Sequence, residues 1–321
     1  MNSKPFVVSL EEHYWDERCL GPISLAASAG SLEIGRRLAN VGEERIQSMD
    51  EAGIDMQVLS HTGPSAQAFP KDIAVEKTRR LNDNLAETIA RYPSRFLGFA
   101  ALPTIDPEAA ALELTRCVKT LGFKGGIVFG LTDGHFIDEK PFWPIFAAAA
   151  NLNVPIYLHP AMPHPAVTAA YYADYENDFP MLTRAAWGFT VEAATQAVRL
   201  IVSGALQKYP GLRIILGHLG EGLPFLLWRI QNTLVSKQGV PVDIQNVFKT
   251  SFYLTTSGFF STPALKYVIE EFGSDRVMFS VDYPFMSNTR ATDWIRDAKI
   301  SEPVRHQVMG GTAVRLLHIH P

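Results

Sequence analysis

Short apolar runs recur along the chain, and each is followed by a longer segment whose hydrophobic residues have helical spacing. Nearly continuous apolar runs are typical of strands that are covered on both faces in a parallel sheet. They predict strands at 6–13, 55–62, 96–103, 123–130, 154–160, 213–220, 252–258 and 276–284. The segments between them predict helices at 43–53, 71–91, 107–121, 142–151, 190–208, 222–236, 262–273 and 291–316, the last one broken near Pro303.

Capping residues support several of these helix boundaries. Asp106 and Thr262 each precede a proline, so each is expected to cap a helix whose first residue is that proline. Gly53, Gly122 and Gly273 fall where predicted helices should end, because glycine accepts the left-handed backbone of a helix C-terminus.

The alternation of strands and helices predicts an α/β fold, a (β/α)8 TIM barrel. Parallel crossovers are right-handed, and eight of them in 321 residues favour a closed barrel over an open doubly wound sheet. An open sheet would need a glycine-rich loop after the first strand, where this chain has Glu-Glu-His-Tyr-Trp at 11–15. We expect one domain over residues 1–321, with long connections at 14–42 and 161–189 over the active site.

Composition narrows the class of protein further. The chain is 47% hydrophobic and carries a net charge of −4, with lysine and arginine scattered along it. It therefore lacks the basic surface of a nucleic-acid binder and the basic patch of a membrane-surface protein. Neither a signal peptide nor an 18-residue apolar stretch is visible, and Cys19 and Cys117 are expected to be separate thiols. A cytoplasmic location is the expectation.

Acidic and imidazole side chains follow several of the predicted strands, at the barrel end where active sites lie. The strand period of two places Glu11 and His13 on one face and Glu12 on the other. Taken alone, His13 or His159 could be an interior histidine, and Asp282 could be a turn residue. Together, two carboxylates and two imidazoles at one barrel mouth suit Zn²⁺ or Mn²⁺. Glu11, His13, His159 and Asp282 are therefore the predicted ligands.

Three further residues are candidates for work beside the metal. His218 and Glu221 flank the end of the sixth strand; His218 could transfer protons or orient substrate, with Glu221 fixing its tautomer. Alternatively, Glu221 could simply lie favourably at the N-terminus of the next helix. His61 ends the second strand and could line the pocket.

These residues together resemble the amidohydrolase superfamily, and specifically its decarboxylase branch. That branch includes γ-resorcylate, 2,3-dihydroxybenzoate, 5-carboxyvanillate and aminocarboxymuconate-semialdehyde decarboxylases, and the likeness is greatest to the γ-resorcylate type. The likeness extends over nearly the whole chain and is carried by the motifs Leu-Glu-Glu-His at 10–13, Tyr-Leu-His-Pro at 157–160, Ile-Leu-Gly-His-Leu-Gly-Glu-Gly-Leu-Pro at 215–224, Trp-Arg-Ile at 228–230, Thr-Thr-Ser-Gly at 255–258 and Phe-Ser-Val-Asp-Tyr-Pro-Phe at 279–285.

The resemblance implies one divalent metal ion bound by the four predicted ligands, with His218 and Glu221 acting beyond them. It also implies a homodimer or homotetramer in which Arg229 reaches a neighbouring subunit's site, although the residue alone would suggest a surface salt bridge. Many amidohydrolases begin with His-x-His and carry a carbamylated lysine after strand four. Here the first motif is Glu-x-His and strand four ends Ile-Val-Phe-Gly at 127–130, which argues against a second metal ion.

The activity that the resemblance implies is nonoxidative decarboxylation of a small aromatic acid with an ortho hydroxyl. Asp282 is the expected proton donor, while Arg229, Phe285 and His61 are expected to contact the substrate. The same metal site could instead serve a hydrolase or hydratase of a ring-cleavage product, with Asp282 as a base acting on water. A catalytically silent barrel that only binds its ligand is the third alternative, and the intact metal and proton-transfer residues disfavour it.

Overall fold

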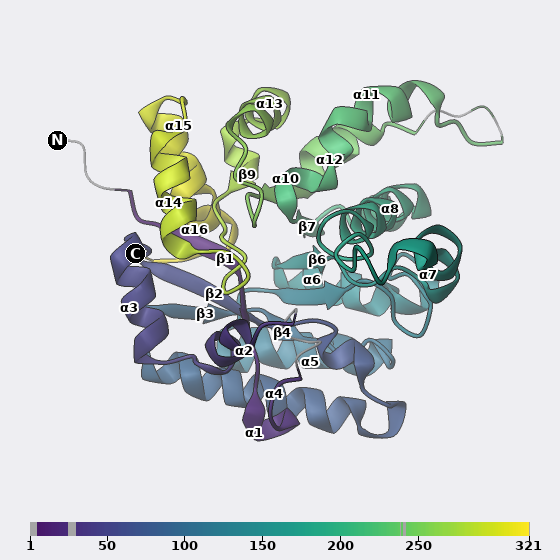
Figure 1. Cartoon of the computed structure of the whole chain (residues 1–321). Helices are drawn as coiled ribbons and strands as arrows, with labels where there is room; N and C mark the ends of the chain where they lie inside the picture. The colour runs from purple at the N-terminus through teal and green to yellow at the C-terminus, as the bar shows by residue number, and fades with distance from the viewer. Residues whose placement is uncertain (1–4, 25–29, 238, 240–241, 321) are drawn as a thin grey trace.

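A computed structural model of the chain shows a ring of parallel strands surrounded by helices (Figure 1). The structure describes residues 5–24, 30–237, 239 and 242–320, so residues 25–29 of the predicted long connection lie outside the described part. The strands are β1 (Val8–Tyr14), β2 (Met56–His61), β3 (Phe96–Gly98), β4 (Ala100–Ala101), β5 (Gly126–Phe129), β6 (Pro155–His159), β7 (Arg213–Leu216), β8 (Phe252–Thr255) and β9 (Val277–Met278).

The strands pair in chain order and in parallel, so the barrel predicted from the sequence is confirmed. β3 and β4 together form the third predicted strand, which is interrupted at Phe99; the N–H of Phe99 still donates to the carbonyl of Leu59 at 2.9 Å. The ring closes between its first and last strands through a parallel bridge from Glu12 to Tyr283. There the N–H of His13 donates to the carbonyl of Tyr283 at 2.7 Å.

The longer helices among the described residues cover the ring, and each overlaps a predicted one. They are α3 (Glu43–Ala52), α4 (Lys71–Arg91), α5 (Pro107–Leu121), α6 (Trp143–Leu152), α8 (Gly188–Ser203), α11 (Leu223–Thr233), α13 (Thr262–Phe272) and α14 (Asn288–Asp297). Asp106 caps α5 as predicted, since its side chain accepts from the N–H of Ala109. The predicted cap at Thr262 is wrong: Thr262 is already helical, and the extended Ser261 accepts from the N–H of Ala264 instead.

Shorter helices occupy the connections, and the sequence analysis missed most of them. They are α1 (Glu17–Leu20), α2 (Leu32–Ala39), η1 (Ser65–Ala68), η2 (Lys140–Phe142), α7 (Pro165–Tyr171), η3 (Ala173–Tyr175), α9 (Ala205–Lys208), α10 (His218–Glu221), α12 (Ile244–Ser251), η4 (Ser274–Arg276), α15 (Glu302–His306), η5 (Gln307–Gly311) and α16 (Thr312–Leu316). The last predicted helix is broken between α14 and α15, as expected near Pro303. Pro303 lies in the first turn of α15, where a helix accepts proline because the N–H that proline lacks has no partner there.

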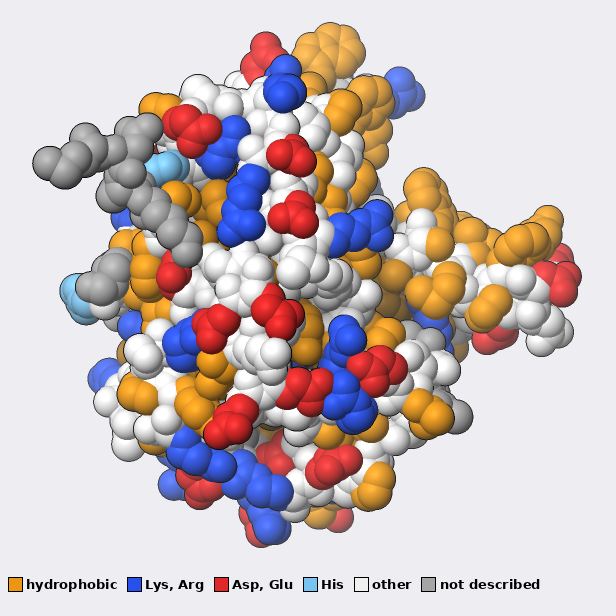
Figure 2. Space-filling model, turned by 60° about the vertical axis from the view of Figure 1, so that its left-hand side comes forward, with side chains coloured by type: hydrophobic (Ala, Val, Ile, Leu, Met, Phe, Trp, Pro, Cys, Tyr) orange, Lys and Arg blue, Asp and Glu red, His pale blue; other side chains and the backbone are white. Residues whose placement is uncertain are grey.

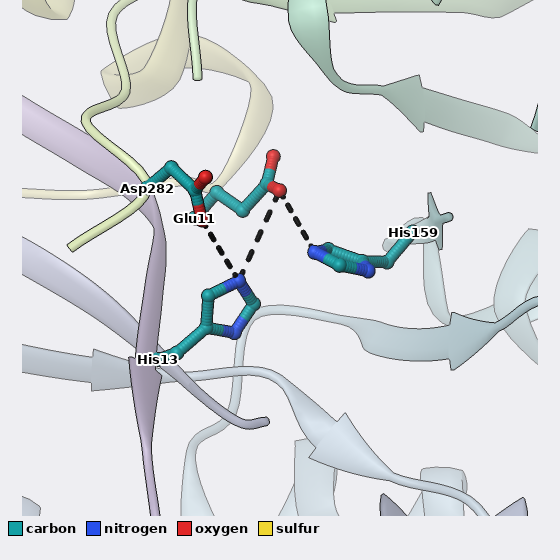
Figure 3. A group of neighbouring side chains, drawn as sticks. All are labelled: Glu11, His13, His159 and Asp282. Atoms are coloured by element: carbon teal, nitrogen blue, oxygen red, sulfur yellow. Dashed lines mark ion pairs between the residues drawn. The ribbon is translucent and has the colours of Figure 1, made fainter. Parts of the chain in front are cut away.

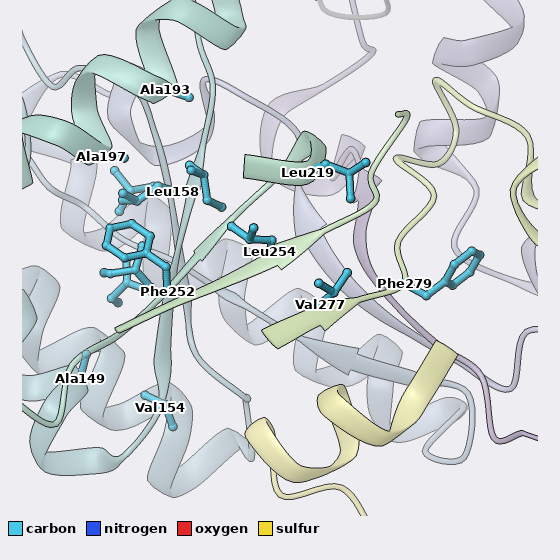
Figure 4. Close-up of a cluster of buried hydrophobic side chains, with 14 of the residues drawn as sticks. Ala149, Val154, Leu158, Ala193, Ala197, Leu219, Phe252, Leu254, Val277 and Phe279 are labelled. Carbon is cyan, nitrogen blue, oxygen red and sulfur yellow. The ribbon is translucent and has the colours of Figure 1, made fainter. Parts of the chain in front are cut away.

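The core has two layers because alternate strand residues point to opposite faces. One layer fills the inside of the ring, and Leu316 and Leu317 near the C-terminus belong to it. The ring itself contributes Val8, Leu10, Met56, Val58, Phe99, Ile127, Phe129, Tyr157, Ile215, Tyr253 and Met278 to this layer. The other layer packs between the strands and the helices (Figure 4). The carboxyl ends of the strands form the rim on which the candidate site is built.

Two further observations concern the cysteines and the helix lengths. Cys19 and Cys117 are both free thiols. Within the described residues, no helix combines the length and the apolar character needed to cross a membrane.

Candidate metal centre and active site

The four predicted ligands converge at the mouth of the barrel (Figure 3). Glu11 and His13 come from β1, His159 is the last residue of β6, and Asp282 follows β9. One ligand atom from each side chain lies within 4.8 Å of the others. The arrangement is compact enough for one divalent ion, whose bonds to nitrogen and oxygen are about 2.0–2.2 Å long.

The Oε1 atom of Glu11 lies at the centre of this cluster. It is 2.9 Å from Nε2 of His159 and 3.9 Å from Nε2 of His13. The Oδ1 atom of Asp282 lies 3.3 Å from the same nitrogen of His13. Glu11 and His13 are buried, while Asp282 and His159 are partly exposed toward the mouth, so the cluster has one open side.

Hydrogen bonding shows that this donor set fits a cation. Nδ1 of His159 is 2.6 Å from the carbonyl of Pro160, so that nitrogen carries the proton and Nε2 presents a lone pair. The lone pair faces Oε1 of Glu11, a buried oxygen without a hydrogen-bond donor among the described residues. Two acceptors facing each other repel, and a cation between them removes the conflict. Metal-ligating histidines commonly donate their second ring N–H to a carbonyl in this way.

A buried hydrogen-bond chain holds Glu11 in place. The hydroxyl of Tyr157 donates to Oε2 of Glu11 and lies 2.9 Å from the hydroxyl of Thr255 and 3.3 Å from that of Ser257. The backbone at Gly217 also approaches closely, because a Cβ there would lie 3.0 Å from Oε2 of Glu11. The sequence analysis did not select Tyr157, although it stands two residues before His159 and therefore on the same face of β6.

The cluster concentrates negative charge. Burial favours the neutral acid, yet the neighbouring imidazoles of His218, His159 and His13 hold the pKa of Glu11 well below its usual value. Burial would lower the pKa of His13, but Asp282 and Glu11 raise it to about 9. A proton and a metal ion therefore compete for the same nitrogen, as is usual for histidine ligands.

His218 and Glu221 form a pair next to the cluster. Nδ1 of His218 donates to Oε1 of Glu221 at 2.7 Å, and Nε2 of His218 lies 3.9 Å from Oε1 of Glu11. The hydroxyl of Thr190 donates to the other oxygen of Glu221 at 2.8 Å. Burial acts to lower the pKa of His218, but Glu221 and Glu11 raise it to about 10. The contact fits the predicted tautomer control by Glu221; the catalytic role of the pair stays a prediction.

The backbone of this pair is left-handed. His218, Leu219 and Glu221 have φ values of 49°, 53° and 54°, and Gly220 and Gly222 have φ values of 86° and 72°. Non-glycine residues rarely adopt this conformation, and backbone strain of this kind is concentrated at active sites and ligand sites. The label α10 therefore covers a tight left-handed turn between β7 and α11 rather than a regular helix.

Two aromatic rings line the cluster. The ring of Phe285 meets His13 edge-on at 5.7 Å between centroids, so it lies beside the cluster; its contact with the substrate stays a prediction. Phe129, at the end of β5, lies 4.6 Å from the ring of His159 and 6.2 Å from that of His13. The sequence analysis used Phe129 only to note that lysine is missing there and did not identify it as part of the site.

The structure does not bring the other two predicted substrate contacts into the cluster. His61 is buried, with Trp15 and Tyr14 rings at 5.0 and 5.3 Å, and its Nδ1 donates to the carbonyl of Thr62 at 2.9 Å. Burial lowers the pKa of His61 to about 4. Arg229 is exposed on α11 and forms no ion pair with any residue in the described part of the chain, so its role stays a prediction.

The barrel and its cluster define the class of protein as a metal-dependent (β/α)8-barrel enzyme. The chain belongs to the amidohydrolase family, which it matches over residues 13–319. It is 40% identical to the γ-resorcylate decarboxylase of Polaromonas sp. strain JS666, in an alignment 338 positions long that covers 100% of both chains.

Solved structures give the same result. A 2,6-dihydroxybenzoate decarboxylase from Rhizobium is 38% identical and superposes with a TM-score of 0.89, covering 98% of this chain and 99% of the other. A dihydroxybenzoic acid decarboxylase from Polaromonas sp. JS666, with bound manganese and the inhibitor 2-nitroresorcinol, is 38% identical with a TM-score of 0.90, covering 98% of this chain and 97% of the other.

Proposed function

We propose that this chain is a metal-dependent nonoxidative decarboxylase of a small aromatic carboxylic acid with a hydroxyl ortho to the carboxylate. The observation that carries the proposal is the convergence of Glu11, His13, His159 and Asp282 around the unpaired oxygen of Glu11. Full-length relatives named γ-resorcylate and 2,6-dihydroxybenzoate decarboxylases support the reaction and the substrate class.

The four clustered side chains would hold one divalent ion, Zn²⁺ or Mn²⁺, and manganese in the Polaromonas relative supports Mn²⁺. When bound, the ion supplies electrostatic stabilisation for negative charge on the carboxylate and the neighbouring phenolic oxygen. A single ion is consistent with Phe129, an apolar ring beside His159, at the end of β5.

The residues of the chain supply the proton. Asp282 is partly exposed at the mouth, so its acid form can give a proton to the ring carbon that bears the carboxylate. The electrons of the carbon–carbon bond then return to the ring, CO2 leaves, and the proton takes its place. Asp282 is left as a carboxylate and is reprotonated by water. His218, held by Glu221, stabilises the charge that changes during these steps.

Substrate protonation gives a direct test of the reaction. With 2,6-dihydroxybenzoate in heavy water, we expect CO2 release and one deuterium at the carbon that lost the carboxylate, measured by NMR. Benzoate is the control: it lacks the hydroxyl that enriches the ring carbon in electrons, so it should not react. If no ortho-hydroxylated acid releases CO2 but a ring-cleavage dienoate is hydrolysed or hydrated, the decarboxylase proposal fails.

We also propose a homo-oligomer, a dimer or tetramer, built on an apolar surface of α11 and the 161–189 connection. Figure 2 shows hydrophobic side chains gathered on a lobe that projects on the right and, separately, at the top of the molecule. The most exposed on these two segments are Tyr171, Phe179, Phe225 and Trp228, at 71%, 63%, 80% and 71%. Exposed apolar patches of this kind mark interaction sites. Arg229, beside Trp228, would then reach a neighbouring subunit's site.

Charge placed on this surface should separate the subunits. We expect Trp228→Asp to give monomers by light scattering, and Arg229→Ala to stay assembled but lose activity. Leu112→Asp is the matched control, because Leu112 is 72% exposed on α5, outside the proposed surface. A wild-type chain that is monomeric at working concentration and fully active would rule the proposal out.

We further propose that the chain acts as one barrel domain in the cytoplasm. The family match over residues 13–319 supports one domain, and the free thiols of Cys19 and Cys117 suit a reducing compartment.

A further inference from the structure

Glu12 is a buried carboxylate whose partners lie around Asp282, far away in sequence. Its Oε1 accepts from the backbone N–H of Val281 at 3.0 Å, and its Oε2 accepts from that of Tyr283 at 3.1 Å. These are the two amides that flank Asp282. A single side chain thus binds the backbone immediately before and after one predicted metal ligand.

This contact replaces the hydrogen bonds that a strand would supply. β9 ends at Met278, and within the described residues the seam between β1 and the segment after β9 has one backbone bridge, from Glu12 to Tyr283. Asp282 sits on that seam with φ of 72°, a left-handed conformation unusual for a residue with a side chain. Its backbone direction therefore depends on the groups that hold the neighbouring amides.

Other polar groups orient Glu12 in turn. The hydroxyl of Ser9 donates to its Oε1, and the hydroxyl of Ser280 lies 3.4 Å from the same oxygen while accepting from the N–H of Glu11 at 2.7 Å. Arg45 supplies the opposite charge from α3: it is buried, donates to the carbonyl of His13, and lies over the Tyr283 ring at 4.7 Å. The network connects the backbones of three predicted ligands.

We propose that Glu12 is a positioning residue that directs Asp282 toward the metal ion and the substrate by fixing the amides on both sides of it. The proposal rests on the metal-binding and proton-donor roles given to Asp282 above. Glu12 itself faces away from the cluster, so it would contact neither the metal ion nor the substrate. Glutamine at this position keeps one carbonyl oxygen, but its NH2 group would face the N–H of Val281 or Tyr283, so one of the two bonds is lost and a repulsion replaces it.

Glu12→Gln tests the proposal, with Glu113→Gln as the matched control. Glu113 is also a buried carboxylate, bonded to Asn82 and Arg116 on the outer helices. The measurements are the thermal midpoint of each metal-free protein, the Mn²⁺ dissociation constant from the electron paramagnetic resonance signal of free Mn²⁺, and separate kcat and KM values.

We expect both variants to melt earlier, but only Glu12→Gln to bind Mn²⁺ more weakly, by about 10–100-fold, the loss typical when a group supporting a metal ligand is removed. We expect kcat of Glu12→Gln to fall more than KM rises. If Glu12 acts through Asp282, adding Glu12→Gln to Asp282→Asn should cost little beyond Asp282→Asn alone. Wild-type Mn²⁺ affinity in Glu12→Gln, or losses that simply add in the double variant, would overturn the proposal.

Two further results distinguish failure of this proposal from misfolding of the variant and from failure of the proposed function. If Glu12→Gln does not fold, Ser9→Ala removes one bond to the same carboxylate and should weaken Mn²⁺ binding several-fold; unchanged binding there would count against the proposal. If no hydroxybenzoate is decarboxylated by the wild-type chain, the proposed function fails, while the Mn²⁺ affinities still decide whether Glu12 positions Asp282.

Discussion

His159→Ala should leave a folded barrel that retains Mn²⁺ poorly and releases almost no CO2. Removing a group that merely supports a ligand costs about 10–100-fold in metal affinity, and loss of a ligand itself should cost at least as much. The side chain of His159 lies at the partly exposed mouth of the site, so its removal should disturb the packed interior little. Elemental analysis after gel filtration and a CO2-release assay measure the two effects.

His135→Ala provides the control for losing a histidine near the barrel rim. Its side chain is 62% exposed and pairs with Glu139 rather than with the cluster. We expect it to keep one metal ion per chain and full activity. Undiminished metal retention in His159→Ala, or two tightly bound ions in the wild-type chain, would show that the ligand set has been assigned wrongly.

His218→Ala should separate metal binding from turnover. The ligand atoms of Glu11, His13, His159 and Asp282 all lie within 4.8 Å of one another, and His218, bonded to Glu221, is not a member of that group, which places its ring beside the cluster. We expect one metal ion per chain and a loss in kcat on the order of 10²–10⁴-fold, the usual contribution of a general acid–base group. Metal analysis and steady-state kinetics on the same preparation provide the measurement.

Glu221→Gln is the companion variant for His218. Glutamine can still accept from Nδ1 of the ring but no longer carries the charge that raises the pKa of His218. Metal content should again be complete, and kcat should fall less than in His218→Ala. If His218→Ala loses metal as readily as His13→Ala, then His218 is a ligand, and the boundary between binding and catalysis lies elsewhere.

The barrel and its cluster could be predicted from sequence because both depend on short-range patterns. Apolar runs and caps such as Asp106 are local, and the rule that active sites lie at strand ends places Glu11, His159 and Asp282 together without any knowledge of packing. The same reasoning reached Glu221, because a residue three positions after His218 can fold back onto it.

The parts of the site that could not be predicted from the sequence depend on contacts between distant segments. Glu12 was placed on the face opposite the metal, and nothing local indicates that its partners are the amides of Val281 and Tyr283. Phe129 looks like an ordinary strand residue until the barrel brings it against His159. Tyr157 could have been predicted. It lies two residues before His159 on the same strand, so both side chains point to the same face, as those of Glu11 and His13 do.

At the left-handed turn 218–222, the proposed catalytic role of His218 and Glu221 conflicts with the stability of the fold. A left-handed backbone costs residues other than glycine about 1–2 kcal/mol each, and three of these five positions carry such residues. Selection for heat resistance alone would therefore replace His218 and Glu221 with glycine and lose the imidazole–carboxylate pair. Natural proteins commonly keep destabilising residues where activity needs them. Lineages that evolve toward higher temperature should gain their stability in the outer helices and leave this turn unchanged.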